Sequence, residues 1–284
     1  MKISYYPGCS LEGTASDYEA SIHAICAALD IELVDLPDWS CCGATAAHSI
    51  NHKAAIELAG RNVAIAEKQE MDMMVPCPLC FNRLKTAEKV LTGPEKNNYR
   101  YILSGDKVRI LDIVNFLADE KILQQIHSKI VTPLTHLKTV CYYGCQSSRP
   151  PEITGAKDYE NPMGMDRILK TLGANPIQWS FKTDCCGASH ILPLQDVAFT
   201  MIEKLYKGAV EAKASCFVVS CQMCQLNLDA YQTRINQALG TDYYLPVLYI
   251  TELIGMATGQ AEYTNWFGRH FVDPGRMLTE CGLA

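Results

Sequence analysis

Several features that would assign a protein to a broad class are missing from this chain of 284 residues. It has no apolar run of the roughly 18 to 20 residues that a transmembrane helix needs. Acidic residues outnumber basic ones, 31 to 25, and no Lys/Arg-rich tract is present, which argues against a nucleic-acid partner. The first seven residues are too few and too polar to form a signal peptide. We therefore expect a cytoplasmic protein with no membrane span and no nucleic-acid partner.

Cysteine, by contrast, is abundant. The chain has 14 cysteines in an otherwise ordinary globular composition that is 48% hydrophobic and 20% charged. A chain of this length forms adequate cores without disulfides, and cysteines in this number in a cytosolic protein more often bind metal or do redox chemistry. Core thiols would be scattered along the sequence, whereas most of these cysteines fall into motifs.

Three motifs occur twice in the same order. Residues 5–9 (YYPGC) are echoed by residues 142–145 (YYGC), residues 40–45 (SCCGAT) by 184–189 (DCCGAS), and residues 75–80 (VPCPLC) by 219–224 (VSCQMC). In both halves 34 residues separate the Cys-Cys pair from the C-x-x-C motif. The interval between the first cysteine and the Cys-Cys pair differs, with 31 residues between Cys9 and Cys41 and 39 between Cys145 and Cys185. We infer two homologous domains, residues 1–136 and 137–284, joined near residues 119–137.

The segments between the motifs alternate between two patterns. Short apolar or β-prone runs at 2–6, 32–36, 71–75, 138–143, 176–179 and 216–220 predict strands. Apolar residues at intervals of three and four predict helices over 16–29, 54–67, 197–212 and 223–235. This order predicts an α/β fold of two Rossmann-like halves with parallel sheets, related by a pseudo-twofold axis. Each cysteine motif follows a strand, so we expect the five motif cysteines of each half to meet at the carboxyl edge of its sheet.

Five thiols in one place favour an iron–sulfur cluster. A C-x-x-C pair alone is shared by zinc sites and redox pairs, and a closed zinc site uses four ligands. Neighbouring cysteines in extended backbone point apart, so they suit the several irons of a cluster. The glycines beside the motifs, Gly8, Gly43, Gly144 and Gly187, either allow close approach of backbone to a cluster or simply form tight turns. Among the remaining cysteines, we expect Cys26 and Cys216 to be core thiols and leave Cys141 and Cys281 without a role.

The duplicated pattern resembles the cysteine-rich "CCG" domain, Cys…Cys-Cys-Gly…Cys-x-x-Cys. This domain occurs in heterodisulfide reductases, in thiol-dependent fumarate reductases and in subunits of glycolate, lactate and glycerol-3-phosphate oxidation systems. The resemblance extends from residue 2 to about residue 256. Since no C-x-x-C-x-x-C-x-x-x-C-P ferredoxin run is present, the chain looks most like the family of stand-alone B subunits of soluble heterodisulfide reductase.

That resemblance implies two noncubane [4Fe-4S] clusters, with the disulfide of coenzyme M and coenzyme B reduced to two thiols between them. The clusters, rather than side chains, would be catalytic. Carried over to this sequence, the first cluster would be held by Cys9, Cys41, Cys42, Cys77 and Cys80, and the second by Cys145, Cys185, Cys186, Cys221 and Cys224.

Partners and substrate contacts follow from the same resemblance. It implies electrons delivered by the C subunit of heterodisulfide reductase, which has cubane clusters, and by its flavin-containing A subunit, together with a hydrogenase or formate dehydrogenase. The chain itself has no G-x-G-x-x-G or Walker motif for a nucleotide cofactor. The substrate is anionic, so we name His48, Arg83, Arg149 and His190 as weak candidates for binding it, each also explicable as a surface or capping residue. Tail aromatics (Trp266, Phe267 and Phe271) either dock a partner or pack on the second half.

Two alternatives stay open. One is a related oxidoreductase with the same ligands, such as a thiol-dependent fumarate reductase or a sulfur-oxidation subunit. The other is a non-catalytic subunit that only transfers electrons, or one in which zinc stabilises a half.

Overall fold

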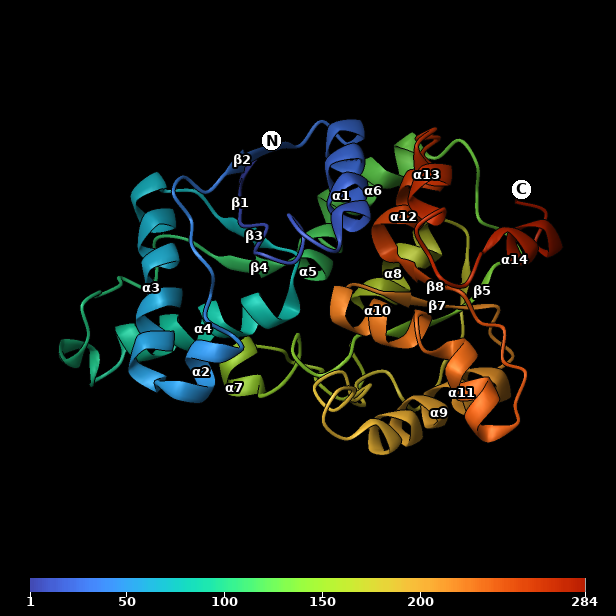
Figure 1. Ribbon diagram of the computed structural model, residues 1–284. Helices are drawn as coiled ribbons and strands as arrows, with labels where there is room; N and C mark the ends of the chain where they lie inside the picture. The colour runs from blue at the N-terminus through green and yellow to red at the C-terminus, as the bar shows by residue number, and fades with distance from the viewer. Residues whose placement is uncertain (284) are drawn as a thin grey trace.

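Two sheets of four parallel strands organise the molecule, as a computed structural model that describes residues 1–283 shows (Figure 1). The first sheet has the order β2-β1-β3-β4 and contains β1 (Lys2–Tyr5), β2 (Glu32–Asp35), β3 (Met73–Val75) and β4 (Ile110–Asp112). The second has the order β6-β5-β7-β8 and contains β5 (Lys138–Tyr142), β6 (Asn175–Pro176), β7 (Cys216–Val219) and β8 (Val247–Tyr249). The two orders are the same once the strands are numbered within each half, which confirms the predicted α/β fold with two similar halves.

Helices connect the strands in both halves. The first half contains α1 (Ser16–Ala28), α2 (Ala46–Ile50), α3 (His52–Gln69), α4 (Pro78–Thr92), α5 (Ile113–Leu117) and α6 (Glu120–Lys129). The second contains α7 (Pro151–Thr154), α8 (Gly164–Thr171), α9 (Gln195–Glu211), α10 (Gln222–Asp229), α11 (Gln232–Leu239), α12 (Ile250–Ala257), α13 (Tyr263–Phe267) and α14 (Gly275–Glu280). Among the described residues, no helix is long and apolar enough to cross a membrane.

The halves lie side by side (Figure 1), and two equivalent helix pairs are among the contacts that join them. α1 packs on α12, and α5 packs on α8. α1 and α8 follow the first strand of their halves, β1 and β5, and α5 and α12 follow the fourth, β4 and β8. Each pair therefore joins the helix after the first strand of one half to the helix after the fourth strand of the other, as a pseudo-twofold axis requires. Tyr18 stacks on Tyr249 at this junction with ring centroids 4.1 Å apart, and the hydroxyls of Ser21 and Thr251 lie 2.6 Å apart.

The elements differ from the predictions in several places. Several helices, α4 and α6 among them, were not predicted, and the strand predicted over 176–179 is the two-residue β6. Each sheet has a fourth strand, β4 or β8, that was not predicted. The helix predicted over 223–235 is interrupted and forms α10 and α11. In the tail, Trp266 and Phe267 are buried, and Trp266 packs so closely on Gly255 of α12 that a Cβ there would lie 2.6 Å from its ring. These two aromatics pack within the molecule, whereas Phe271 is 72% exposed.

Candidate functional site

The five motif cysteines of the first half converge beyond the carboxyl ends of β1, β2 and β3. Cys42 Sγ lies 3.2 Å from Cys80 Sγ. The thiol of Cys80 also contacts that of Cys77, and the thiol of Cys9 contacts that of Cys41. We call these five residues the first thiol cage. Segments that lie as far apart as residues 9 and 80 meet because parallel strands end at one edge of the sheet.

The second half repeats this arrangement. Cys186 Sγ lies 3.7 Å from Cys224 Sγ, Cys224 contacts Cys221, and Cys145 contacts Cys185. These five residues form the second thiol cage. Its thiol contacts match those of the first cage pair by pair, so the sequence repeat is also a repeat of geometry.

Glycines allow backbone to approach the sulfurs in both cages. A Cβ on Gly8 would lie 3.0 Å from Cys80 Sγ, and a Cβ on Gly144 would lie 3.0 Å from Cys224 Sγ. Both have positive φ, 74° and 66°, which a residue with a side chain rarely adopts. The amides of Gly43 and Gly187 donate to Cys41 Sγ at 3.4 Å and to Cys185 Sγ at 3.3 Å. The glycines therefore form turns, and their amides or missing side chains face cysteine sulfur; their approach to a cluster stays a prediction.

A tyrosine before each cage fixes the loop that carries the Cys-Cys pair. Tyr6 donates its hydroxyl to the carbonyl oxygen of Ser40 at 2.8 Å, and Tyr142 donates to that of Asp184 at 2.7 Å. Each acceptor is the residue directly before a Cys-Cys pair. The repeated tyrosine therefore has a structural reason, because it ties the end of one strand to the cysteine loop that follows its neighbour.

Hydrogen bonds within each cage lower the pKa of some cysteines and raise that of their thiol partners, such as Cys80 and Cys145. Cys77 is the N-cap of α4, and the amide of Cys80 donates to Cys77 Sγ at 3.5 Å. A hydrogen bond from the Cys80 thiol, opposed by burial and aided by Gln222, lowers the pKa of Cys77 to about 7. The thiol of Cys145, opposed by burial and aided by the Gly187 amide and by His190, lowers the pKa of Cys185 to about 6. Each cage thus contains a cysteine that readily gives up its proton to become a metal ligand.

Contacts between the halves hold the two cages against each other, and no motif in the sequence indicates them. Gln222, within the second C-x-x-C turn, donates its side-chain amide to Cys77 Sγ of the first cage at 2.9 Å. Asn82 of α4 donates to the carbonyl oxygens of Gln146, at 3.1 Å, and Arg149, at 2.8 Å, in the loop after Cys145. No periodicity or spacing signals such pairs, since the partners lie 145, 64 and 67 positions apart.

The four basic residues proposed for anion binding fall into three places. His48 Nδ1 and Arg83 Nη1 lie 3.1 Å apart, so these two residues form one group beside the first cage. Arg149 donates to Glu160 at 2.7 Å and to Thr183 at 3.0 Å, which engages its guanidinium within the second half. His190 lies close enough to Cys185 to help lower its pKa. Their role in binding an anion stays a prediction.

The cysteines outside the motifs lie away from the cages. Cys26, Cys141 and Cys216 are buried in α1, β5 and β7, and Cys281 contacts the carbonyl oxygen of His136. Burial raises the pKa of the Cys26, Cys141 and Cys216 thiols, as expected for core residues. The placement of Cys26 and Cys216 in the core is confirmed.

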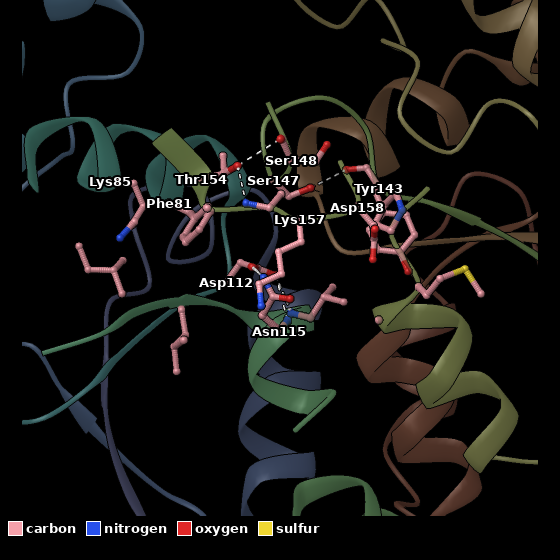
Figure 2. Close-up of a pocket in the computed structure, with 18 of the residues that line it drawn as sticks. Phe81, Lys85, Asp112, Asn115, Tyr143, Ser147, Ser148, Thr154, Lys157 and Asp158 are labelled. Carbon is pink, nitrogen blue, oxygen red and sulfur yellow. Dashed lines mark hydrogen bonds between the residues drawn. The ribbon is translucent and has the colours of Figure 1, made fainter. Parts of the chain in front are cut away.

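A pocket of about 530 Å³ opens between the halves (Figure 2). Phe81 and Lys85 of α4 line one side, and Ser147, Ser148 and Lys157 of the second half line another. Phe81 directly follows Cys80, and Ser147 lies two residues after Cys145. The buried hydroxyl of Ser148 has no hydrogen-bond partner within residues 1–283. The pocket therefore offers polar groups from both halves, although none of the ten motif cysteines is among the residues that line it.

The donor sets of the cages fit iron–sulfur clusters. Each cage brings five free thiols together, more than a closed zinc site uses, and each has a backbone amide directed at sulfur. The glycines without side chains leave room beside Cys80 and Cys224. Hydrogen bonds of this kind to ligand sulfur are the usual means by which proteins tune such clusters.

Known proteins are similar to this chain in sequence and in fold. A model of the cysteine-rich domain family CCG matches residues 3–85 and 139–229. The chain is 30% identical over 264 residues to the 8-methylmenaquinol:fumarate reductase membrane anchor subunit of Wolinella succinogenes, covering 91% of this chain and 92% of the relative. It is also 30% identical over 269 residues to the B subunit of the ferredoxin:CoB-CoM heterodisulfide reductase of Methanosarcina mazei, covering 91% and 89%.

A solved structure supports the fold alone. The crystal structure of a hypothetical protein from Helicobacter pylori superposes with a TM-score of 0.70 at 12% identity, covering 96% of this chain and 52% of that one. This chain thus spans about half the length of that protein. The family match covers both cages in full, and the relatives align over nearly the whole chain. The chain therefore belongs to the cysteine-rich CCG domain family, carries two copies of that domain, and is homologous to the B subunit of heterodisulfide reductase.

Proposed function

We propose that this chain is the catalytic iron–sulfur subunit of an enzyme that reduces the coenzyme M–coenzyme B heterodisulfide to two thiols. The observation that carries the proposal is the pair of equivalent five-thiol cages in contact through Gln222 and Cys77. Each cage would hold one noncubane [4Fe-4S] cluster, the first through Cys9, Cys41, Cys42, Cys77 and Cys80 and the second through Cys145, Cys185, Cys186, Cys221 and Cys224. The similarity to the Methanosarcina mazei protein supports this substrate.

The arrangement suits a reaction that needs two electrons. Reduction of R–S–S–R′ takes two electrons and two protons and yields RSH and R′SH. Two bound clusters would supply the electrons, one each. The chain contributes the geometry. The cages would fix two metal sites around one interface, and the pocket of Figure 2 would accommodate one arm of the substrate between the halves. The His48–Arg83 pair, Arg149 and His190 would attract its anionic ends.

Electrons would come from a partner. We propose the C subunit of heterodisulfide reductase, with its cubane clusters, and the flavin-containing A subunit, with a hydrogenase or formate dehydrogenase as the source, in the cytoplasm. Both relatives named above are themselves subunits by name, which supports a multi-subunit enzyme. All fourteen cysteines are free thiols, as is usual in a reducing compartment.

A second candidate has its own support. The similarity to the Wolinella succinogenes fumarate reductase protein equals the similarity to the Methanosarcina mazei heterodisulfide reductase protein in percentage identity. In that case the same two cages would transfer electrons to a partner that reduces fumarate, and the chain would not itself reduce a disulfide.

Metal analysis and turnover separate these candidates. The chain is purified without oxygen, assayed for iron, sulfide and zinc, and tested for reduction of the heterodisulfide by a reduced dye. The proposal predicts about eight irons per chain, negligible zinc, and turnover. About eight irons without disulfide turnover would favour the electron-transfer candidate. About four irons with one zinc would rule out a mechanism that uses two clusters.

A further inference from the structure

The two cages differ at the residue that follows the first cysteine of each C-x-x-C turn. In the second half this residue is Gln222, which is 4% exposed and whose Nε2 lies 2.9 Å from Cys77 Sγ in the opposite half. In the first half it is Pro78, which has neither a backbone N–H nor a side-chain donor. Within residues 1–283, Cys221 Sγ receives no hydrogen bond from the opposite half in return. The contact between the halves is therefore one-sided. Within its own half the second cage has only a longer side-chain amide contact, from Gln146 Nε2 to Cys145 Sγ at 3.8 Å.

The orientation of the Gln222 amide agrees with a metal-bound sulfur. A thiolate that ligates a metal can only accept hydrogen bonds, so it selects the Nε2 side of the amide. Gln222 presents this side to Cys77 Sγ, and its Oε1 has no partner within the described chain. The bond lies in a buried site, where the low dielectric strengthens its electrostatic effect.

We infer that Gln222 raises the reduction potential of the cluster held by the first cage above that of the cluster held by the second cage. A hydrogen bond to a ligand sulfur withdraws electron density from it, so it stabilises the reduced cluster, which carries one more negative charge. Gln222 acts as a tuning residue through Cys77 rather than on the substrate. The inference rests on the clusters of the proposed function, but not on the identity of the substrate.

The size of the effect is measurable. A difference of about tenfold in the one-electron equilibrium constant corresponds to about 59 mV. After uptake of one electron, most molecules would then have the electron in the first half, and the singly reduced protein would show one main EPR signal instead of two of equal weight.

A potentiometric titration followed by EPR on the full chain, with both clusters loaded, tests this inference. Wild type should show two one-electron midpoints separated by about tenfold in equilibrium constant. Gln222→Leu, which removes the donor, should lower the higher midpoint until it approaches the other, and the second midpoint should stay in place. Gln222→Glu, which replaces the amide by an ionised carboxylate, should lower the higher midpoint further.

Met223→Leu is the matched control, because Met223 follows Gln222 in the same turn and is 41% exposed; both midpoints should be unchanged. Iron and sulfide content confirms that each variant is loaded. If Gln222→Leu left both midpoints in place, or moved both equally, the inference would be wrong. A loaded chain without disulfide turnover would overturn the proposed reaction, yet the shift on Gln222→Leu would still support the tuning role.

Discussion

At the scale of single residues, each cage depends on a position without a side chain. Gly144 has a positive φ of 66° and lies where a Cβ would stand 3.0 Å from Cys224 Sγ. A side chain here would strain the backbone and would also push the sulfur away from its place in the cage. Gly155, in the same half, has a positive φ of 73° but nothing within 4 Å of its missing Cβ.

These two glycines separate backbone strain from crowding of the cage. Gly144→Ala should lose much of the second cluster, so that iron per chain falls from about eight toward about four. Gly155→Ala should cost only about 1 kcal/mol of unfolding free energy from the left-handed backbone and keep its iron. Iron analysis and thermal melting of both variants check this prediction. If both variants lost iron equally, backbone strain alone would explain the loss.

How much of the site could be predicted depends on the range of the interaction. The ten motif cysteines and the glycines beside them were found because the repeat marks both copies in the sequence. The convergence of the thiols then follows from strand order. Gln222 and Asn82 were missed because their function lies in contacts with the opposite half, which depend on how two folded surfaces meet. The role of the cysteines as cluster ligands stays a prediction.

At the scale of elements, the start of α12 rests on a buried pair of charged groups. Glu252 accepts the backbone amide of Tyr249 at 2.7 Å and lies 2.9 Å from His270 Nε2. Burial lowers the pKa of His270, but the Glu252 carboxylate, with smaller contributions from Asp229 and Asp17, raises it more, to about 9. The pair therefore links α12, which packs on α1 between the halves, to the tail that follows α13.

This raised pKa predicts a pH-dependent stability. A histidine whose pKa rises from 6.5 to about 9 on folding contributes stability in full below pH 6.5 and loses it as the pH rises through about 9. The melting temperature of wild type should exceed that of His270→Gln by more at pH 6.5 than at pH 9. In a Glu252→Gln background the His270→Gln substitution should lose most of this pH dependence. A constant difference across this pH range would show that folding does not raise the pKa of His270.

The two strands that the sequence did not predict are short, and one predicted helix is interrupted. β4 and β8 have three residues each, too few for a period-two pattern, and each runs directly into a helix. The apolar spacing over 223–235 continues through residues 230 and 231, where the chain leaves the helix between α10 and α11. A tertiary contact accompanies the interruption: Gln232 in α11 donates to the carbonyl oxygen of Leu245 at 3.0 Å and accepts from its amide at 2.9 Å.

At the scale of the whole molecule, each half completes the site of the other. The buried side chain of Asn82 lies in the first half, yet both of its acceptors, the carbonyl oxygens of Gln146 and Arg149, belong to the loop after Cys145. Asn82→Leu would leave those carbonyls without their donor, at a cost of about 1–3 kcal/mol each where they stay buried. We expect the variant to loosen the second cage while the first, which contains no bond to Asn82, stays loaded.

Iron analysis then gives a result specific to this coupling. Asn82→Leu should reduce iron from about eight toward about four per chain. It should also remove the EPR signal of the second cluster, whose midpoint Gln222→Leu leaves in place. Lys89→Ala is the control, since Lys89 lies on the same helix and reaches the carbonyl oxygen of Glu152 at 3.2 Å from an exposed position, so its loss should cost little. Loss of the first cluster instead of the second would mean that Asn82 supports the turn at the start of α4. Full iron content in Asn82→Leu would mean that each half folds around its cluster independently of the other.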